Sequence, residues 1–265
     1  MISNTFKNAW SYRAFILGSV KREFQVKYQN SMLGALWNVI NPLAMIFVYT
    51  VIFSQLMRAK LPGVDSTFGY SIYLCTGILA WGLFSEVFSR NVNIFLENSN
   101  LLKKINFPSL CLPIISILSA LLNFSIIFSL FIIFLVLSGT FPGMVIFLSV
   151  PILCILILFA VGLGITLGVL NVFFRDIGQL VGVGIQLWFW GTPIIYPLNI
   201  LPEKIQIIVM LNPLTTIFNA LQMIIVRGQV PNFYSLLPVF ILSVILCVFG
   251  IKLYRKHSNE MVDEL

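Results

Sequence analysis

Long apolar stretches separated by short polar segments run through most of the sequence. A helix needs about 20 apolar residues to cross the ~30 Å hydrocarbon core of a bilayer. Lipid offers no partners for free backbone groups, and continuous rather than alternating apolar runs favour helices over a β-barrel. The pattern therefore predicts an all-α integral membrane protein with six transmembrane helices. The predicted spans are residues 33–57, 68–87, 112–137, 144–170, 177–196 and 233–251.

The longest charge-free stretch holds two of these spans. No charged residue lies between Lys104 and Arg175, and this stretch is far too long for one helix across a bilayer. The segment Gly139-Thr-Phe-Pro-Gly143 divides it, because proline and glycine favour a turn. Arg175 and Asp176 then stand alone, since the next charge is Glu203. A charge at the bilayer centre would cost about 2.5–3.5 kcal/mol, so we expect this pair at a membrane surface.

Residues 205–226 are apolar and uncharged but contain Asn212-Pro213 near their middle. They could form a seventh span or a re-entrant pair of short helices before the last span. With six spans and both termini inside, about 12 basic residues lie inside and about 4 outside, whereas seven spans give about 10 and 6. The positive-inside rule thus favours the re-entrant pair, and Pro213 removes a helix hydrogen-bond donor at the expected break. Asn212 and Pro213 are a candidate break in a gate on the outer side.

The pattern divides the chain into a cytoplasmic interface segment (residues 1–32), a transmembrane domain (residues 33–257) and a cytoplasmic tail (residues 258–265). Apolar residues at helical spacing in the first segment predict an amphipathic helix at the membrane interface. A disordered basic tail is the alternative. The expected apolar face consists of Phe6, Trp10, Leu17, Val20 and Phe24, with Arg13 within it and Phe15 opposite.

The longest polar connection, residues 86–109, is expected on the cytoplasmic side between the second and third spans. Within it, the stretch from Glu97 to Lys104 could form a short helix that Pro108 ends. A loop of this size could dock a soluble partner, or it could be a solvated connector.

Composition supports the membrane class. Of 265 residues, 59% are hydrophobic and 9% charged, whereas a soluble domain carries about 25% charged residues. The net charge of +7 lies in short loops, where it suits membrane topology and anionic lipid better than nucleic acid. The four cysteines lie far apart without metal-ligand spacing, and the single histidine lies near the C-terminus, so no metal site is expected.

The sequence lacks the motifs of an energy-coupling or catalytic centre. It contains no G-x-x-x-x-G-K-[ST] motif, so we expect no ATP site in this chain. Glu86 and Arg90 fit the inner end of the second span, which leaves no chain of carboxylates at depth such as ion-coupled carriers use. No nucleophile–base pair with histidine suggests an enzyme. If the chain transports, its energy would come from another subunit.

Aromatic residues gather in or near the second and fifth spans. Such rings can stack on sugar faces while their OH and NH groups form hydrogen bonds, which would suit the wall of a glycan channel. An aromatic belt at the lipid headgroups is the alternative. The candidates are Tyr70, Tyr73, Trp81, Trp188, Trp190 and Tyr196.

Several segments carry a family resemblance in their order and spacing. They are KREFQVKYQNSMLGALW at 21–37 with Asn41-Pro42, FFRDI at 173–177, TPIIYP at 192–197, and LNPL at 211–214 with Arg227-Gly228. Together they resemble the membrane subunits of ABC-2 type transporters that export polysaccharides such as O-antigen, capsule and teichoic acid. The resemblance spans nearly the whole chain and implies the same six spans, interface helix and re-entrant pair.

The resemblance also implies partners and a location. It implies a homodimer with a channel between its subunits, a separate ATPase docked on the cytoplasmic side, and a lipid-linked polysaccharide as the substrate. The chain would lie in the bacterial inner membrane with both termini in the cytoplasm. Alternatives are a stand-alone channel or secondary carrier, or an ABC-2 exporter of small molecules. The glycan itself differs among members of this group.

Certain residues gain roles by this resemblance. Glu97, Lys103 and Lys104 resemble part of a coupling loop, and Arg175 and Asp176 resemble an inner-face contact with the ATPase. Residues 205–226 would form the outer gate.

Overall fold

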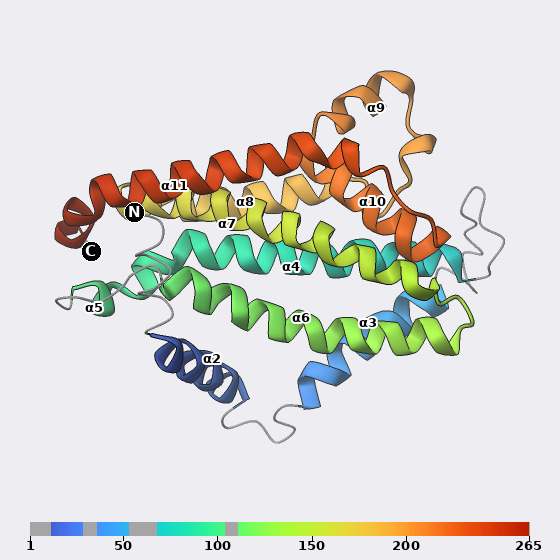
Figure 1. Ribbon diagram of the computed structural model, residues 1–265, viewed down its shortest axis with the longest axis horizontal. Coiled ribbons are helices and arrows are strands. Elements are labelled where there is room, and N and C mark those ends of the chain that lie inside the picture. Colours follow the sequence, from blue (N-terminus) through green and yellow to red (C-terminus); the bar gives the residue numbers. More distant parts are fainter. Residues whose placement is uncertain (1–11, 29–35, 53–67, 104–110, 265) are drawn as a thin grey trace.

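The computed structural model describes residues 12–28, 36–52, 68–103 and 111–264 (Figure 1). Every regular element in these ranges is a helix, which confirms the all-α fold. The α-helices are α2 (Arg13–Tyr28), α3 (Trp37–Thr50), α4 (Gly69–Glu97), α5 (Ser99–Leu102), α6 (Cys111–Leu137), α7 (Ser149–Phe173), α8 (Asp176–Trp190), α9 (Glu203–Met210), α10 (Pro213–Arg227) and α11 (Leu237–Glu264). The 3₁₀ helices are η3 (Gly143–Leu148), η4 (Leu198–Ile200) and η5 (Phe233–Leu236).

Helices α4, α6, α7 and α11 lie lengthwise side by side (Figure 1). The most extensive helix contacts are those of α7 with α11 and with α4. Glycines permit the close approach: a Cβ added at Gly168 would lie 2.5 Å from the backbone oxygen of Asn91, and one at Gly162 would lie 2.7 Å from the backbone nitrogen of Cys247. Small residues at such crossings let helix backbones meet without a strong hydrophobic drive between helices in lipid.

Four helical segments among the described residues are long and apolar enough to cross a membrane, namely residues 69–97, 111–137, 143–173 and 233–264. The bent pair α9–α10 would raise this number to five if it formed one span. Helix α3, with 14 residues, and α8, with 15, are shorter than the ~20 residues that a straight crossing needs. The membrane fold is therefore confirmed, whereas the count of six spans is not.

Helix α8 ends before the predicted span 177–196 does. The helix stops at Trp190, and a turn follows through Thr192-Pro193, where proline removes a helix donor. The predicted span 33–57 is described only in part, because residues 33–35 and 53–57 lie outside the described ranges.

Two helices continue beyond their predicted ends. Helix α4 runs to Glu97, so the prediction of a polar loop from residue 86 is wrong for its first twelve residues. The polar residues there remain helical because they are packed: Asn91 is fully buried and donates to the carbonyl of Val87. The predicted short helix corresponds to α5 (Ser99–Leu102), while Lys104 and Pro108 lie outside the described residues. Helix α11 likewise continues to Glu264 through the predicted tail.

Helix α2 buries one described member of the predicted apolar face, Val20, against protein together with Ile16. Ile16 and Val20 are buried against Cys111 and Ile115 at the start of α6, whereas Leu17 is 62% exposed. Because α2 packs against α6, contacts with protein rather than lipid alone select its buried face. The predicted members Phe6 and Trp10 lie outside the described residues.

The predicted helix pair is present and sharply bent. Helices α9 and α10 meet at 99°; α9 stands out from the bundle in Figure 1, whereas α10 packs against α4 and α7. Helix α10 begins with Pro213 at its first turn, and the side chain of Asn212 accepts a hydrogen bond from the backbone N–H of Leu214. The helix ends at Gly228, whose φ of 62° is left-handed and suits glycine.

Candidate functional site

Asn212 joins the two helices on either side of the bend to the end of α8. Its side-chain oxygen accepts from the indole N–H of Trp188 at 3.0 Å and from the backbone N–H of Leu214 at 3.1 Å. Its amide nitrogen donates to the hydroxyl of Thr192 at 3.0 Å and the carbonyl of Gly191 at 3.3 Å. One half-buried side chain thus fixes the angle between α8 and α10.

Two tyrosines of α4 hold the turn that follows α8. The hydroxyl of Tyr73 donates to the carbonyls of Pro193 and Tyr196, at 3.0 and 2.9 Å, and that of Tyr70 donates to the carbonyl of Ile195 at 2.6 Å. The backbone approaches α4 closely, since a Cβ at Gly77 would lie 3.0 Å from the Ile194 side chain. The turn through residues 192–196 is therefore anchored to the bundle by side chains from a helix distant in sequence.

An aromatic cluster lies beside this turn. Trp81 contacts the rings of Phe84, Phe189 and Phe218, with centroids 5.3, 5.5 and 6.2 Å away. The indole of Trp188 lies edge-on to Phe84 at 5.5 Å. Packed rings of this kind stabilise the junction by burial and by edge-to-face attraction.

The predicted channel aromatics occupy three different environments. Tyr73 and Trp81 are buried, and Tyr70, Trp188 and Tyr196 are half-buried, whereas Trp190 is 64% exposed. The hydroxyl of Tyr196 donates to the carbonyl of Trp190 at 2.7 Å. The three tyrosine hydroxyls are thus engaged by backbone carbonyls, and Trp190 offers the most ring surface of the six. A role for them in a channel stays a prediction.

The turn between α7 and α8, at the other end of α8, is organised by Asn171. This buried side chain donates to the carbonyl of Val92 at 3.1 Å and to the side chain of Asn93 at 3.2 Å, and accepts from the backbone N–H of Gly178 at 2.8 Å. It satisfies one of the free N–H groups at the start of α8. Arg175, between the two helices, and Asp176, the first residue of α8, have exposed side chains.

The predicted coupling residues lie near this turn in the fold. Asn171 binds the α7–α8 turn to the last turns of α4, and α4 ends at Glu97. Glu97 and Lys103 are exposed, and Lys104 lies outside the described residues. The structure therefore brings the two predicted contact segments to one end of the bundle. The sequence reasoning singled out the charges there and missed Asn171, although its position just before FFRD was visible.

A polar cluster links α2, α4 and α6. Arg90 forms ion pairs with Glu23 and, at 3.8 Å, with Glu86. Ser119 donates to Glu23 at 2.7 Å, and Asn123 donates to Glu86 at 3.0 Å. Sequence reasoning placed Glu86 and Arg90 at the inner end of a span but gave no sign of Glu23, because it lies 67 residues from Arg90.

No group of three or more potential metal-ligating side chains occurs within the part of the chain that the structure describes. The geometry provides rigid helix junctions and exposed charges at one end. Apolar spans and a bent helix pair define a multi-pass membrane protein.

Comparison with known proteins specifies the family. The model of the ABC-2 type transporter family matches residues 16–226, and the chain belongs to that family. It is 30% identical to an O-antigen export system permease protein of Klebsiella pneumoniae. The match extends over 245 residues and covers 92% of each chain. It is 26% identical to the permease of the same description from Myxococcus xanthus, over 98% of each chain. It is 20% identical to the polysialic acid transport protein of Escherichia coli, over 91% of this chain and 92% of that one.

Proposed function

We propose that this chain is the channel-forming membrane subunit of an ATP-driven exporter of a lipid-linked polysaccharide. The family membership supports a transport role, and the relatives along nearly the full length are described as O-antigen and polysialic acid transporters. A polysaccharide of the O-antigen or capsule class is the substrate that these descriptions share. ATP and Mg²⁺ would bind to a separate ATPase subunit.

The exposed charged face at one end of the bundle is the observation that supports the docking of an ATPase partner. Asn171 ties the Arg175–Asp176 turn to the end of α4, so that both predicted contact segments share this face. A docked ATPase could therefore move α4 and α8 together. The chain would lie in the bacterial inner membrane. This face and both chain termini would be on the cytoplasmic side.

Two copies of the chain would enclose the channel, and the six predicted spans with an interface segment at residues 1–32 would form each subunit. The bent pair α9–α10 would be the outer gate, with Asn212 holding its position against α8. Exposed Trp190 would offer a sugar-stacking surface beside it.

The function is tested by deleting the gene and analysing surface polysaccharide. We expect loss of the long surface glycan, accumulation of its lipid-linked precursor inside the cell, and recovery when the chain is supplied again. Unchanged surface glycan with loss of small-molecule efflux would instead indicate an ABC-2 exporter of small molecules. Ion-gradient-driven flux in vesicles that contain only this chain would contradict the need for an ATPase partner.

Arg175→Ala tests the docking face. We expect the variant to insert and fold normally, while substrate-stimulated ATP hydrolysis by the assembled complex falls about fivefold, the equivalent of ~1 kcal/mol for an exposed charged contact. The matched control is Lys252→Ala, which removes an exposed cation of α11 and should leave hydrolysis unchanged. Equal hydrolysis rates for Arg175→Ala and the unmodified chain would remove Arg175 from the interface.

A further inference from the structure

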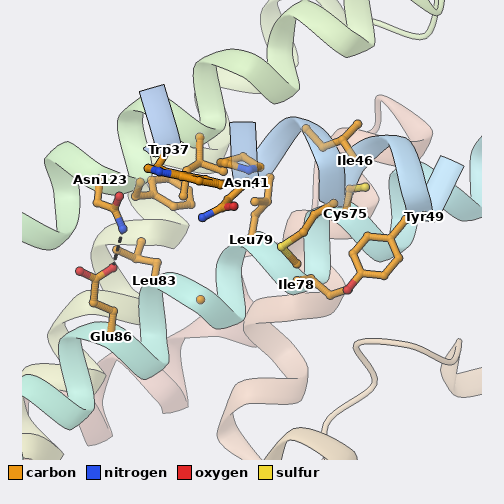
Figure 2. Close-up of a pocket in the computed structure, with 15 residues that line it drawn as sticks. Trp37, Asn41, Ile46, Tyr49, Cys75, Ile78, Leu79, Leu83, Glu86 and Asn123 are labelled. Carbon is orange, nitrogen blue, oxygen red and sulfur yellow. Dashed lines mark hydrogen bonds between the residues drawn. The ribbon is translucent and has the colours of Figure 1, made fainter. Parts of the chain in front are cut away.

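A largely apolar cavity lies between α3, α4 and α6. It has a volume of about 300 Å³; Glu86 and Asn123 lie at one end and Tyr49 at the other, with Asn41 between them (Figure 2). The rest of the wall is mostly apolar. That wall includes Trp37, Met45, Ile46, Cys75, Ile78 and Leu79.

A second cavity of about 490 Å³ adjoins the first on the side of α2. Glu86 and Asn123 line both cavities, and Asn123 donates to Glu86 at 3.0 Å. The polar pair is therefore the point where the two cavities meet. An amphiphile could lie across it with its polar end beside α2 and its apolar end between α3 and α4.

The charges around the second cavity are balanced. Arg22 and Arg90 supply two cations, and Glu23 and Glu86 supply two carboxylates. The side chains of Arg90, Glu23 and Glu86 remain 33%, 41% and 30% exposed, so a headgroup can reach them although they pair with one another. An anionic headgroup would meet two carboxylates, whereas a headgroup with a phosphate and an ammonium finds a partner for each charge.

The apolar cavity has the length of one acyl chain. Cys75 and Glu86 mark the two ends of its α4 wall, and the eleven helical steps from one to the other span ~16 Å at 1.5 Å per residue. One leaflet of a bilayer with ~30 Å of hydrocarbon is about 15 Å deep. Gly69, at the far end of α4, lies ~26 Å from Glu86 along the helix, which places Glu86 near the opposite headgroup boundary.

We propose that these joined cavities bind a phospholipid with a zwitterionic, amine-bearing headgroup, of the phosphatidylethanolamine type. Its phosphate lies by Arg22 and Arg90, its ammonium by Glu23 and Glu86, and one acyl chain fills the cavity between α3, α4 and α6. The bound lipid wedges α2 against the bundle, because the headgroup site is built from α2, α4 and α6 together. This site is independent of which substrate the protein exports.

Gly82→Leu tests the acyl-chain cavity. Gly82 lines it, and an added Cβ there would meet nothing within 4 Å, so a leucine side chain can project into the space without disturbing the fold. We expect native mass spectrometry of the full chain, released from phosphatidylethanolamine nanodiscs, to show about tenfold less bound lipid than the unmodified chain, because the cavity is occupied. Gly182→Leu is the matched control, since Gly182 on α8 also has open space and lines neither cavity.

The double substitution Glu23→Gln, Glu86→Gln tests the headgroup site. It removes both carboxylates that line this cavity and keeps Arg22 and Arg90, so the bound lipid should change from phosphatidylethanolamine to phosphatidylglycerol when both are supplied equally. The single variant Gln25→Glu, on an exposed position of α2 that does not line the cavity, should keep the original preference.

Three outcomes would overturn the proposal. Equal lipid retention by Gly82→Leu and Gly182→Leu would show that no chain occupies the cavity. A preference of the unmodified protein for phosphatidylglycerol would contradict the headgroup assignment. Cross-linking between cysteines introduced at Gly82 of two copies, with loss of bound lipid, would show that a second copy fills the cavity instead.

Discussion

Replacing Gly168 by alanine is expected to destabilise the bundle more than any other single added methyl group along α7. A Cβ at this position would lie 2.5 Å from the backbone oxygen of Asn91, so the α4 backbone itself must move. Overpacking of this kind costs about 1–3 kcal/mol, against ~1 kcal/mol gained from the higher helix propensity of alanine. The net loss of about 1 kcal/mol should shift thermal unfolding of the purified chain down by about 3 °C.

The control is Gly182→Ala, where an added Cβ meets nothing within 4 Å. This variant should unfold at the same temperature or slightly higher, because only the helix propensity changes. Gly164→Ala is a second test of the crossing between α4 and α7, since the added Cβ would lie 2.7 Å from the Cβ of Asn91. If Gly168→Ala and Gly182→Ala unfolded alike, α4 and α7 would not approach as closely as described.

The second large effect is expected for Asn212→Ala. The variant loses the cap of α10, worth about 1 kcal/mol, and leaves the indole N–H of Trp188 without its acceptor, worth about 1–3 kcal/mol when buried. Together these losses should lower the free energy of unfolding by about 2–3 kcal/mol, since Trp188 is only half-buried. Surface polysaccharide should fall with it, because the angle between α8 and α10 is released.

Two further substitutions separate the contributions at this junction. Asn212→Asp keeps the acceptor for Leu214 and Trp188 but loses the donor to the hydroxyl of Thr192, so its stability should lie between those of the native chain and Asn212→Ala. Trp188→Phe should cost less in the Asn212→Ala background than alone, because the indole N–H has already lost its partner. Additive effects in this double-mutant cycle would contradict the hydrogen bond between the two side chains.

The long apolar helices and the break at Asn212-Pro213 could be predicted because their signals are local. A run of about 20 apolar residues has one low-energy form in lipid, and proline disrupts a helix wherever it lies. The helix ends were predicted less well where tertiary contacts extend them. Helix α4 continues past the membrane-spanning stretch to Glu97 because Asn91 and Arg90 have partners on neighbouring helices.

The candidate site was predicted as residue types at positions, not as contacts. Composition indicated that Tyr70 and Tyr73 matter, but the carbonyls that they bind lie 120 to 125 residues away. The charges of Arg175 and Asp176 were conspicuous between apolar runs, whereas Asn171, which builds the turn around them, resembles any polar residue near a helix end. Side-chain partners at such separations depend on packing that no local pattern encodes.

By itself, the sequence determined that the chain is a helical membrane protein with a broken helix pair and an isolated charged turn, and it carried the marks of the ABC-2 transporter family. Hydrophobic length, proline and charge position act locally, and lipid enforces their consequences. The tertiary structure alone decided which face of α2 is buried, which carbonyls the tyrosines bind, and that Glu23, Glu86 and Arg90 line one cavity together. These features arise where helices distant in sequence come into contact, and at the turn bound by the tyrosines Gly77 permits the close approach.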